Sequence, residues 1–160
     1  AAAPRRAPAG DPRFGAPQMP IWIDFGSEVY GLPDLENRGF KVGLDRDGPP
    51  FRPDHDERKI TKEILNEVRG YMVHRFPDLR NAPLIESRVC QHENTSNVDF
   101  LIDRHPDFEN VWLAGGGSGH GFKHGPALGE YLAERIVSGG EIDERFALAS
   151  KEIVRQRTVY

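Results

Sequence analysis

A run of glycines constrains this chain more than any other feature of its sequence. Five of the seven residues from Gly115 to Gly121 are glycine, after an apolar stretch at 111–114 and before apolar residues at helical spacing over 126–138. This order predicts a strand, a tight turn and a helix. Because glycine adopts positive φ and has no Cβ, such a turn lets the backbone approach a ligand closely.

The start of the predicted last helix favours a negatively charged or electron-rich ligand. Free amides there carry partial positive charge, and Lys123 adds a full positive charge. The run is not a Walker-type phosphate loop, and it fails G-x-G-x-x-G because His120 and Phe122 occupy the last position of the two possible matches. The alternative is a glycine-rich turn between strand and helix that binds no ligand.

Periodicity predicts short strands and two main helices. The first helix is expected at 57–75, with Asp54 or Asp56 as its cap and Phe76-Pro77 at its end. The predicted strands cover 21–25, 29–32, 39–44, 84–90, 100–102 and 111–114. The first three form an antiparallel meander. The fold class that follows is α+β: a mixed sheet of short strands with one helix over it, and a last helix that carries the glycine turn.

The two ends of the chain differ from the rest in composition. Residues 1–20 contain 13 Ala, Pro or Gly residues, of which five are proline. Since proline fixes φ and removes an N–H donor, we expect a flexible lead-in, disordered or extended, through which neither helix nor sheet strand runs. The stretch 141–160 is charged and is expected to be an irregular tail.

Length, charge and cysteine content exclude several classes of protein. The chain of 160 residues is long enough to bury a core, and its single cysteine excludes an internal disulfide. No apolar stretch approaches the roughly 20 residues that span a bilayer, and no signal-peptide pattern is present. The net charge of −4 gives no electrostatic reason to expect nucleic acid. We expect a cytoplasmic protein. We expect no metal site, since His120 and His124 have no carboxylate placed beside them.

Cys90 is a candidate nucleophile at the end of a predicted strand. Alternation places Arg88 and His92 on the same face of that strand. Nearby cations would lower the pKa of the thiol and make it more reactive. The alternative is an inert cysteine that acts as a small apolar residue.

Lys41 is a second candidate, on the strand predicted at 39–44. Its side chain shares a face with those of Gly43 and Asp45, opposite three apolar residues. This face is either a solvated sheet surface or the wall of a cleft, where Gly43 leaves room for a ligand.

Three segments together resemble one enzyme family: 90–95 (CQHENT), 99–106 (DFLIDRHP) and 110–123 (NVWLAGGGSGHGFK). The family is that of FAD-dependent amine and amino-acid oxidoreductases of the monomeric sarcosine oxidase and N-methyltryptophan oxidase type, within the D-amino-acid oxidase class. Segments 30–33 (YGLP) and 39–43 (GFKVG) are similar to the preceding part of that family, in the same order. The resemblance covers residues 18–140.

The resemblance implies roles for individual residues. Cys90 matches the cysteine that carries flavin through a thioether at the 8α carbon, and Lys41 matches the lysine near flavin N5 that promotes the reaction with oxygen. Lys123 matches a lysine near the pyrimidine edge that also meets the substrate carboxylate. The turn that lies against the flavin ring matches Gly116, Gly117, Ser118, Gly119, His120 and Gly121. Asp45 and His92 stand where histidine and tyrosine are usual, and both would face the substrate.

One part of the family's architecture is not found in this sequence. The family begins with a β–α–β unit that carries G-x-G-x-x-G and holds the ADP part of FAD. This chain has neither that motif nor the upstream arginine that binds the substrate carboxylate. We expect the C-terminal portion of a two-domain enzyme, divided into a lead-in (1–20), part of the substrate domain (21–90), the C-terminal segment of the FAD-binding domain (91–140) and a charged tail (141–160).

The expected function is FAD-dependent oxidation of a C–N bond in an amine or N-methyl amino acid. We expect the chain to be incomplete for catalysis alone and to need an N-terminal FAD-binding portion or a partner chain. One alternative is a non-catalytic remnant, or a complementing subunit that binds flavin. Another is a small α+β binding domain with a phosphate-type glycine loop. No membrane or nucleic-acid partner is expected.

Overall fold

The computed structural model describes residues 2–5 and 11–154. Within it the chain divides into two compact units, Ala1–Gln91 and His92–Tyr160. The division falls one residue after the boundary predicted between 90 and 91. The assignment of these units to a substrate domain and an FAD-binding domain stays a prediction.

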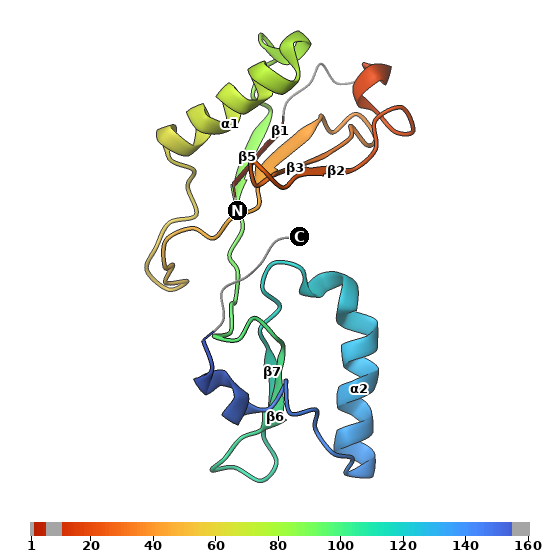
Figure 1. Cartoon of the computed structure of the whole chain (residues 1–160), viewed down its shortest axis with the longest axis vertical. Helices are drawn as coiled ribbons and strands as arrows, with labels where there is room; N and C mark the ends of the chain where they lie inside the picture. The colour runs from red at the N-terminus through yellow and green to blue at the C-terminus, as the bar shows by residue number, and fades with distance from the viewer. Residues whose placement is uncertain (1, 6–10, 155–160) are drawn as a thin grey trace. The chain divides into compact units, whose positions relative to one another are not determined.

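The first unit contains a five-stranded sheet in the order β2-β3-β4-β1-β5, with every strand pair antiparallel (Figure 1). Its strands are β1 (Ala2–Arg5), β2 (Trp22–Asp24), β3 (Val29–Leu32), β4 (Lys41–Leu44) and β5 (Glu86–Val89). Because β2, β3 and β4 are neighbours in chain order, the predicted antiparallel meander is confirmed.

Strand β1 overturns the expectation that no sheet strand runs through the first 20 residues. It pairs with β5 along its whole length, from Ala2↔Val89 to Arg5↔Glu86. Arg5 is the one described residue of β1 that lies opposite a residue of β4, and that partner is Lys41. A proline removes only its own N–H, so Pro4 leaves the carbonyl groups of the strand free to pair.

Helix α1 (Lys62–Arg75) lies against β1 and β4 of this sheet. It begins later than predicted because Thr61 caps it, with Oγ1 accepting a hydrogen bond from the Ile64 N–H (3.3 Å). The prediction of Asp54 or Asp56 as the cap is therefore wrong. The predicted end of the helix before the Phe-Pro pair is confirmed.

The core of the first unit is built around Phe40, which is fully buried. Its ring centroid lies 5.6 Å from that of Phe14, 6.3 Å from that of Trp22 and 5.0 Å from that of Phe76. The buried cluster consists of Phe14, Val29, Phe40, Val42, Leu44, Val68, Met72 and Leu79. Phe14 belongs to the 3-10 turn η1 (Pro12–Phe14), and Leu79 to η2 (Pro77–Leu79). The predicted lead-in thus contains a short helical turn and supplies a core residue.

The second unit contains a hairpin and a helix. Strands β6 (Leu101–Arg104) and β7 (Trp112–Gly115) pair antiparallel, and the 3-10 turn η3 (Gly121–His124) leads into α2 (Gly125–Ser138). Helix α2 ends at Gly139, whose φ of +70° is the left-handed conformation that suits glycine there. The α+β class with two main helices is confirmed, although the short strands form two antiparallel sheets instead of one mixed sheet. Among the described residues, no helix has both the length and the apolar character to cross a membrane.

The described part of the predicted tail, 141–154, is ordered against the hairpin. It contains the 3-10 helix η4 (Leu148–Glu152). The Phe146 carbonyl accepts a hydrogen bond from the Ile102 N–H of β6 (2.9 Å), and the Leu148 N–H donates to Asp103 Oδ2 (2.7 Å). The expectation of an irregular tail is therefore wrong for this stretch, and the rest of it, 155–160, lies outside the described residues.

Candidate functional site

The glycine turn between β7 and η3 contains three residues with left-handed backbone. Gly116, Ser118 and Gly119 have φ of +75°, +46° and +76°. Glycine adopts this region without steric cost, whereas a serine there is strained. The turn is closed by hydrogen bonds to the Gly117 carbonyl from the His120 N–H (2.9 Å) and the Gly121 N–H (2.7 Å). The predicted order of strand, tight turn and helix is confirmed.

Glu93 fixes the inner side of this turn. Its carboxylate accepts a hydrogen bond from the Gly116 N–H (3.0 Å), and its backbone carbonyl accepts one from the Ser118 N–H (3.0 Å). Ser118 is 1% exposed, and its Oγ donates to the Gly116 carbonyl (3.1 Å). Glu93 was not predicted from the sequence, because no local pattern links it to a turn 23 positions later.

Two of the glycines are required by the packing of the chain on itself. A Cβ on Gly116 would lie 2.5 Å from Cγ2 of Thr95, and a Cβ on Gly119 would lie 2.5 Å from Cε1 of His92. Neither position has room for a side chain. The hypothesis of a turn without a ligand therefore accounts for part of the glycine run.

Gly117 and the residues that follow the turn have different properties. A Cβ on Gly117 would meet nothing closer than the Gly121 Cα at 3.6 Å, an ordinary contact. Phe122 is fully exposed, and Lys123 is exposed. Within residues 11–154, no side chain caps the amino end of η3 or α2. An exposed cation next to a glycine that packing does not require suits an anionic or electron-rich ligand edge. The first amides of η3 and α2, those of Gly121 and Gly125, already donate to the carbonyl groups of Gly117 and Phe122.

Two histidines flank the turn. The His92 ring lies over Gly119, as the contact distance above shows. The His120 ring packs edge-on against Phe100 and His124, with centroids 6.3 and 6.2 Å away. In the described part of the chain, no group of three or more His, Cys, Asp or Glu residues is placed to hold a metal ion.

Lys41 lies on β4, on the face opposite the core. Phe40 and Val42 are fully buried on the other face, so the predicted alternation is confirmed. The Lys41 ammonium lies 5.1 Å from the centroid of the Tyr30 ring, a cation–π contact. A Cβ on Gly43 would lie 2.7 Å from Cε1 of Tyr30. The tyrosine ring therefore fills the space over Gly43, and the prediction of room for a ligand there is wrong.

Asp45 and Cys90 lie just beyond the ends of their strands. Asp45 follows β4 and is half-buried, and Cys90 follows β5 and is exposed. Strand alternation does not extend past β5, so the prediction that Arg88, Cys90 and His92 share one strand face is wrong. Arg88 forms an ion pair with a glutamate of its own strand.

A cavity of about 650 Å³ lies in the first unit, and none of its lining residues is predicted to bind a ligand. Trp22, Phe25, Tyr71 and Phe76 are among its lining residues. The indole N–H of Trp22 is buried and has no hydrogen-bond partner among the described residues. The cavity is a competing location for a ligand.

Comparison with known proteins gives a consistent family. A family model described as FAD dependent oxidoreductase matches residues 2–135. L-saccharopine oxidase of Schizosaccharomyces pombe is 32% identical over 113 residues, 71% of this chain and 24% of that protein. Monomeric sarcosine oxidase of an Arthrobacter species is 35% identical over 127 residues, 78% of this chain and 32% of that protein. This chain therefore spans less than a third of the length of these relatives.

Solved structures resemble this chain in fold. The crystal structure of L-proline dehydrogenase from P. horikoshii matches with a TM-score of 0.76 and 23% identity, over 96% of this chain and 40% of that one. Amadoriase I from Aspergillus fumigatus, a fructosyl amine:oxygen oxidoreductase, matches with a TM-score of 0.73 and 22% identity, over 91% of this chain and 36% of that one.

Proposed function

Because the chain belongs to the FAD-dependent oxidoreductase family, we propose that it forms the C-terminal portion of an enzyme that oxidises a C–N bond of an amine or N-methyl amino acid. Relatives named sarcosine oxidase and N-methyl-L-tryptophan oxidase support this substrate class. The observation that carries the proposal is the exposed Lys123, which follows a glycine turn in which packing does not require Gly117.

The glycine turn is proposed to hold the flavin ring. When bound, FAD would supply the acceptor for a hydride from the carbon next to the substrate nitrogen. The Lys123 ammonium would stabilise negative charge at the pyrimidine edge. Gly117 would let the ring approach the backbone, since no side chain intervenes there. Lys123 would also bind a substrate carboxylate.

Further roles are proposed for four residues outside the turn. Lys41 would provide a fixed positive charge that promotes the reaction of reduced flavin with oxygen, and its contact with Tyr30 restrains the ammonium. Cys90 is exposed, as a thiol that forms a thioether with flavin must be before the bond is made. Asp45 and His92 would face the substrate, and packing on Gly119 fixes the His92 ring beside the turn.

The proposal includes the arrangement of the whole enzyme. Residues 21–90 would be part of the substrate domain, and 91–140 the C-terminal segment of the FAD-binding domain. The ADP part of FAD would be held by an N-terminal portion or by a partner chain, because this sequence has no G-x-G-x-x-G motif. The second candidate function is a non-catalytic remnant or a complementing subunit that binds flavin. A cytoplasmic location is also part of the proposal.

The test uses the flavin-loaded protein that contains this chain. After acid precipitation, we expect the flavin absorbance to stay with the protein in the wild type and to be released in Cys90→Ser. Release from the wild type as well would contradict the thioether. Lys123→Ala should raise the KM for an amino-acid substrate, while Lys62→Ala, at the exposed start of α1, should leave it unchanged. Binding of FAD without turnover would favour the complementing subunit.

A further inference from the structure

We propose that Lys151 is a positioning residue for the glycine turn, acting through Asn97 and the loop at 95–99. The inference rests on the proposed function, because the turn is taken to hold flavin. Lys151 belongs to η4, in a stretch that the sequence predicts to be an irregular tail.

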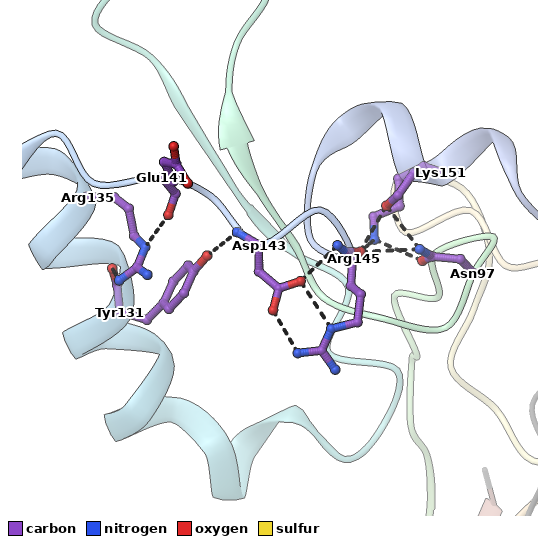
Figure 2. Close-up of polar contacts among 8 residues, drawn as sticks. Asn97, Tyr131, Arg135, Glu141, Asp143, Arg145 and Lys151 are labelled. Atoms are coloured by element: carbon purple, nitrogen blue, oxygen red, sulfur yellow. Dashed lines mark hydrogen bonds and ion pairs between the residues drawn. The ribbon is translucent and has the colours of Figure 1, made fainter.

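The Lys151 ammonium is directed back into the second unit (Figure 2). It donates hydrogen bonds to Oδ1 of Asn97 (2.8 Å) and to the carbonyl groups of Phe100 (2.9 Å) and Arg145 (2.9 Å). Three ammonium protons thus meet three close acceptors. Burial lowers the pKa of Lys151, in keeping with its enclosed position. The side chain therefore joins η4 to a loop more than 50 positions earlier.

Asn97 connects this ammonium to the loop. It is 4% exposed, and its Nδ2 donates to Oγ of Ser150 (3.1 Å) and to the Arg145 carbonyl (3.3 Å). Its Oδ1, which accepts from Lys151, also accepts from the Asp99 N–H (3.2 Å). Asn97 thus holds the loop and the C-terminal segment with one side chain.

The loop carries strain that these contacts offset. Val98 has φ of +61°, a conformation that a β-branched residue rarely adopts and that costs about 1–2 kcal/mol. Such a residue persists only where its surroundings fix it. The hydrogen bonds of Asn97 and Lys151 flank Val98 and provide that constraint.

Thr95 transmits the position of the loop to the glycine turn. Its Oγ1 donates to the Asp99 carbonyl (2.6 Å), which fixes the side-chain rotamer. Its methyl carbon then lies 2.5 Å from the point that a Cβ on Gly116 would occupy, so the methyl group packs close to Gly116. A displaced loop would remove this contact and free the left-handed Gly116.

Other hydrogen bonds also hold the C-terminal segment in place. The effect of Lys151 on the glycine turn can therefore be separated from its effect on the position of that segment. The Tyr131 hydroxyl of α2 accepts a hydrogen bond from the Asp143 N–H (2.7 Å) (Figure 2). The Phe146 carbonyl bonds to β6, as described above. Tyr131→Phe therefore loosens the same segment without touching Asn97, and serves as the matched control.

The experiment compares Lys151→Met with Tyr131→Phe in the flavin-loaded protein that contains this chain. Lys151→Met keeps an unbranched side chain that is one atom shorter, and it removes all the donors. We expect it to speed amide hydrogen exchange at Gly116 and Ser118 and to weaken FAD binding, each by about tenfold, as loss of one hydrogen bond to a charged group would do. Tyr131→Phe should change neither quantity, while exchange near Asp143 increases.

A milder variant covers the case in which Lys151→Met fails to fold. Thr95→Ser keeps the hydroxyl group and removes the methyl group over Gly116, so it should weaken FAD binding by a smaller factor. Unchanged exchange at Gly116 in Lys151→Met, or equal effects of Lys151→Met and Tyr131→Phe on FAD, would overturn the inference. Absence of FAD binding by the wild type would instead contradict the proposed function, because exchange at Gly116 is measured without FAD as well.

Discussion

Each of the two units is stabilised internally by a different kind of interaction. The first has a buried cluster of eight apolar residues centred on aromatic rings. In the described part of the second, Ile102 is the one buried apolar side chain, while Asn97 and Ser118 are buried polar residues. An apolar core tolerates small shifts of its members, whereas a polar network depends on particular atoms. The unit with the glycine turn is therefore the one whose geometry single polar groups control.

The largest effect is expected from Phe40→Ala in the first unit. Removing a fully buried phenylalanine leaves a cavity and should lower the free energy of unfolding by about 3–5 kcal/mol. Urea unfolding, followed by Trp22 fluorescence in a Trp112→Phe background, reports on this core because the Trp22 ring stacks near Phe40. Phe108→Ala, at a residue 59% exposed, is the control and should change stability by less than about 0.5 kcal/mol. A cost for Phe40→Ala as small as that of the control would show that the aromatic cluster is not the core.

A smaller effect on stability should distinguish alanine substitutions at two glycines of the second unit. Gly116 and Gly139 have nearly the same φ, +75° and +70°, so alanine at either position should cost about 1–2 kcal/mol of backbone strain. Gly139 has open space around it, whereas Gly116 lies under the Thr95 methyl group. Gly116→Ala should therefore cost more than Gly139→Ala in thermal unfolding and should alone weaken FAD binding. Equal costs would mean that the turn is not packed as described.

The smallest effect is a difference in response to alkali. Burial, and then the hydrogen bond to Asp24 (2.9 Å), raise the pKa of Tyr71 to about 12 in the first unit. Because the folded state holds the phenol proton more tightly than the unfolded state, Tyr71 contributes to stability. This contribution is complete below the ordinary pKa of 10 and is lost as pH rises towards 12. In the second unit, burial lowers the pKa of Lys151, so the contribution of Lys151 to the stability of that unit increases as pH rises.

Titration of the phenolate absorbance, with hydrogen exchange of each unit, measures this difference. Between pH 10 and 12 the first unit should become less stable, and Tyr71→Phe should abolish that change. Ionisation of Tyr71 at its ordinary pKa would indicate that the phenol is not held against Asp24.

Local patterns in the sequence predict most helices and strands. The features that these patterns do not predict depend on contacts between residues that are distant in the chain. The meander, the end of α1 and the glycine turn follow from neighbouring residues. Strand β1 does not, because its partner β5 is more than 80 positions away. In the site, the glycines and Lys123 are visible as a motif, whereas Glu93 and Lys151 act across the chain. Local sequence patterns do not show that the space over Gly43 is filled, because the ring that covers it belongs to Tyr30 of the neighbouring strand.

The most direct test of the account is a hydrogen-exchange map of the protein that contains this chain, with and without FAD. We predict that, within this chain, FAD protects the backbone amides at 115–123 most strongly. The cavity lined by Trp22 and Tyr71 should show little change. Protection centred on that cavity, or none at 115–123, would contradict the claim that the glycine turn holds flavin.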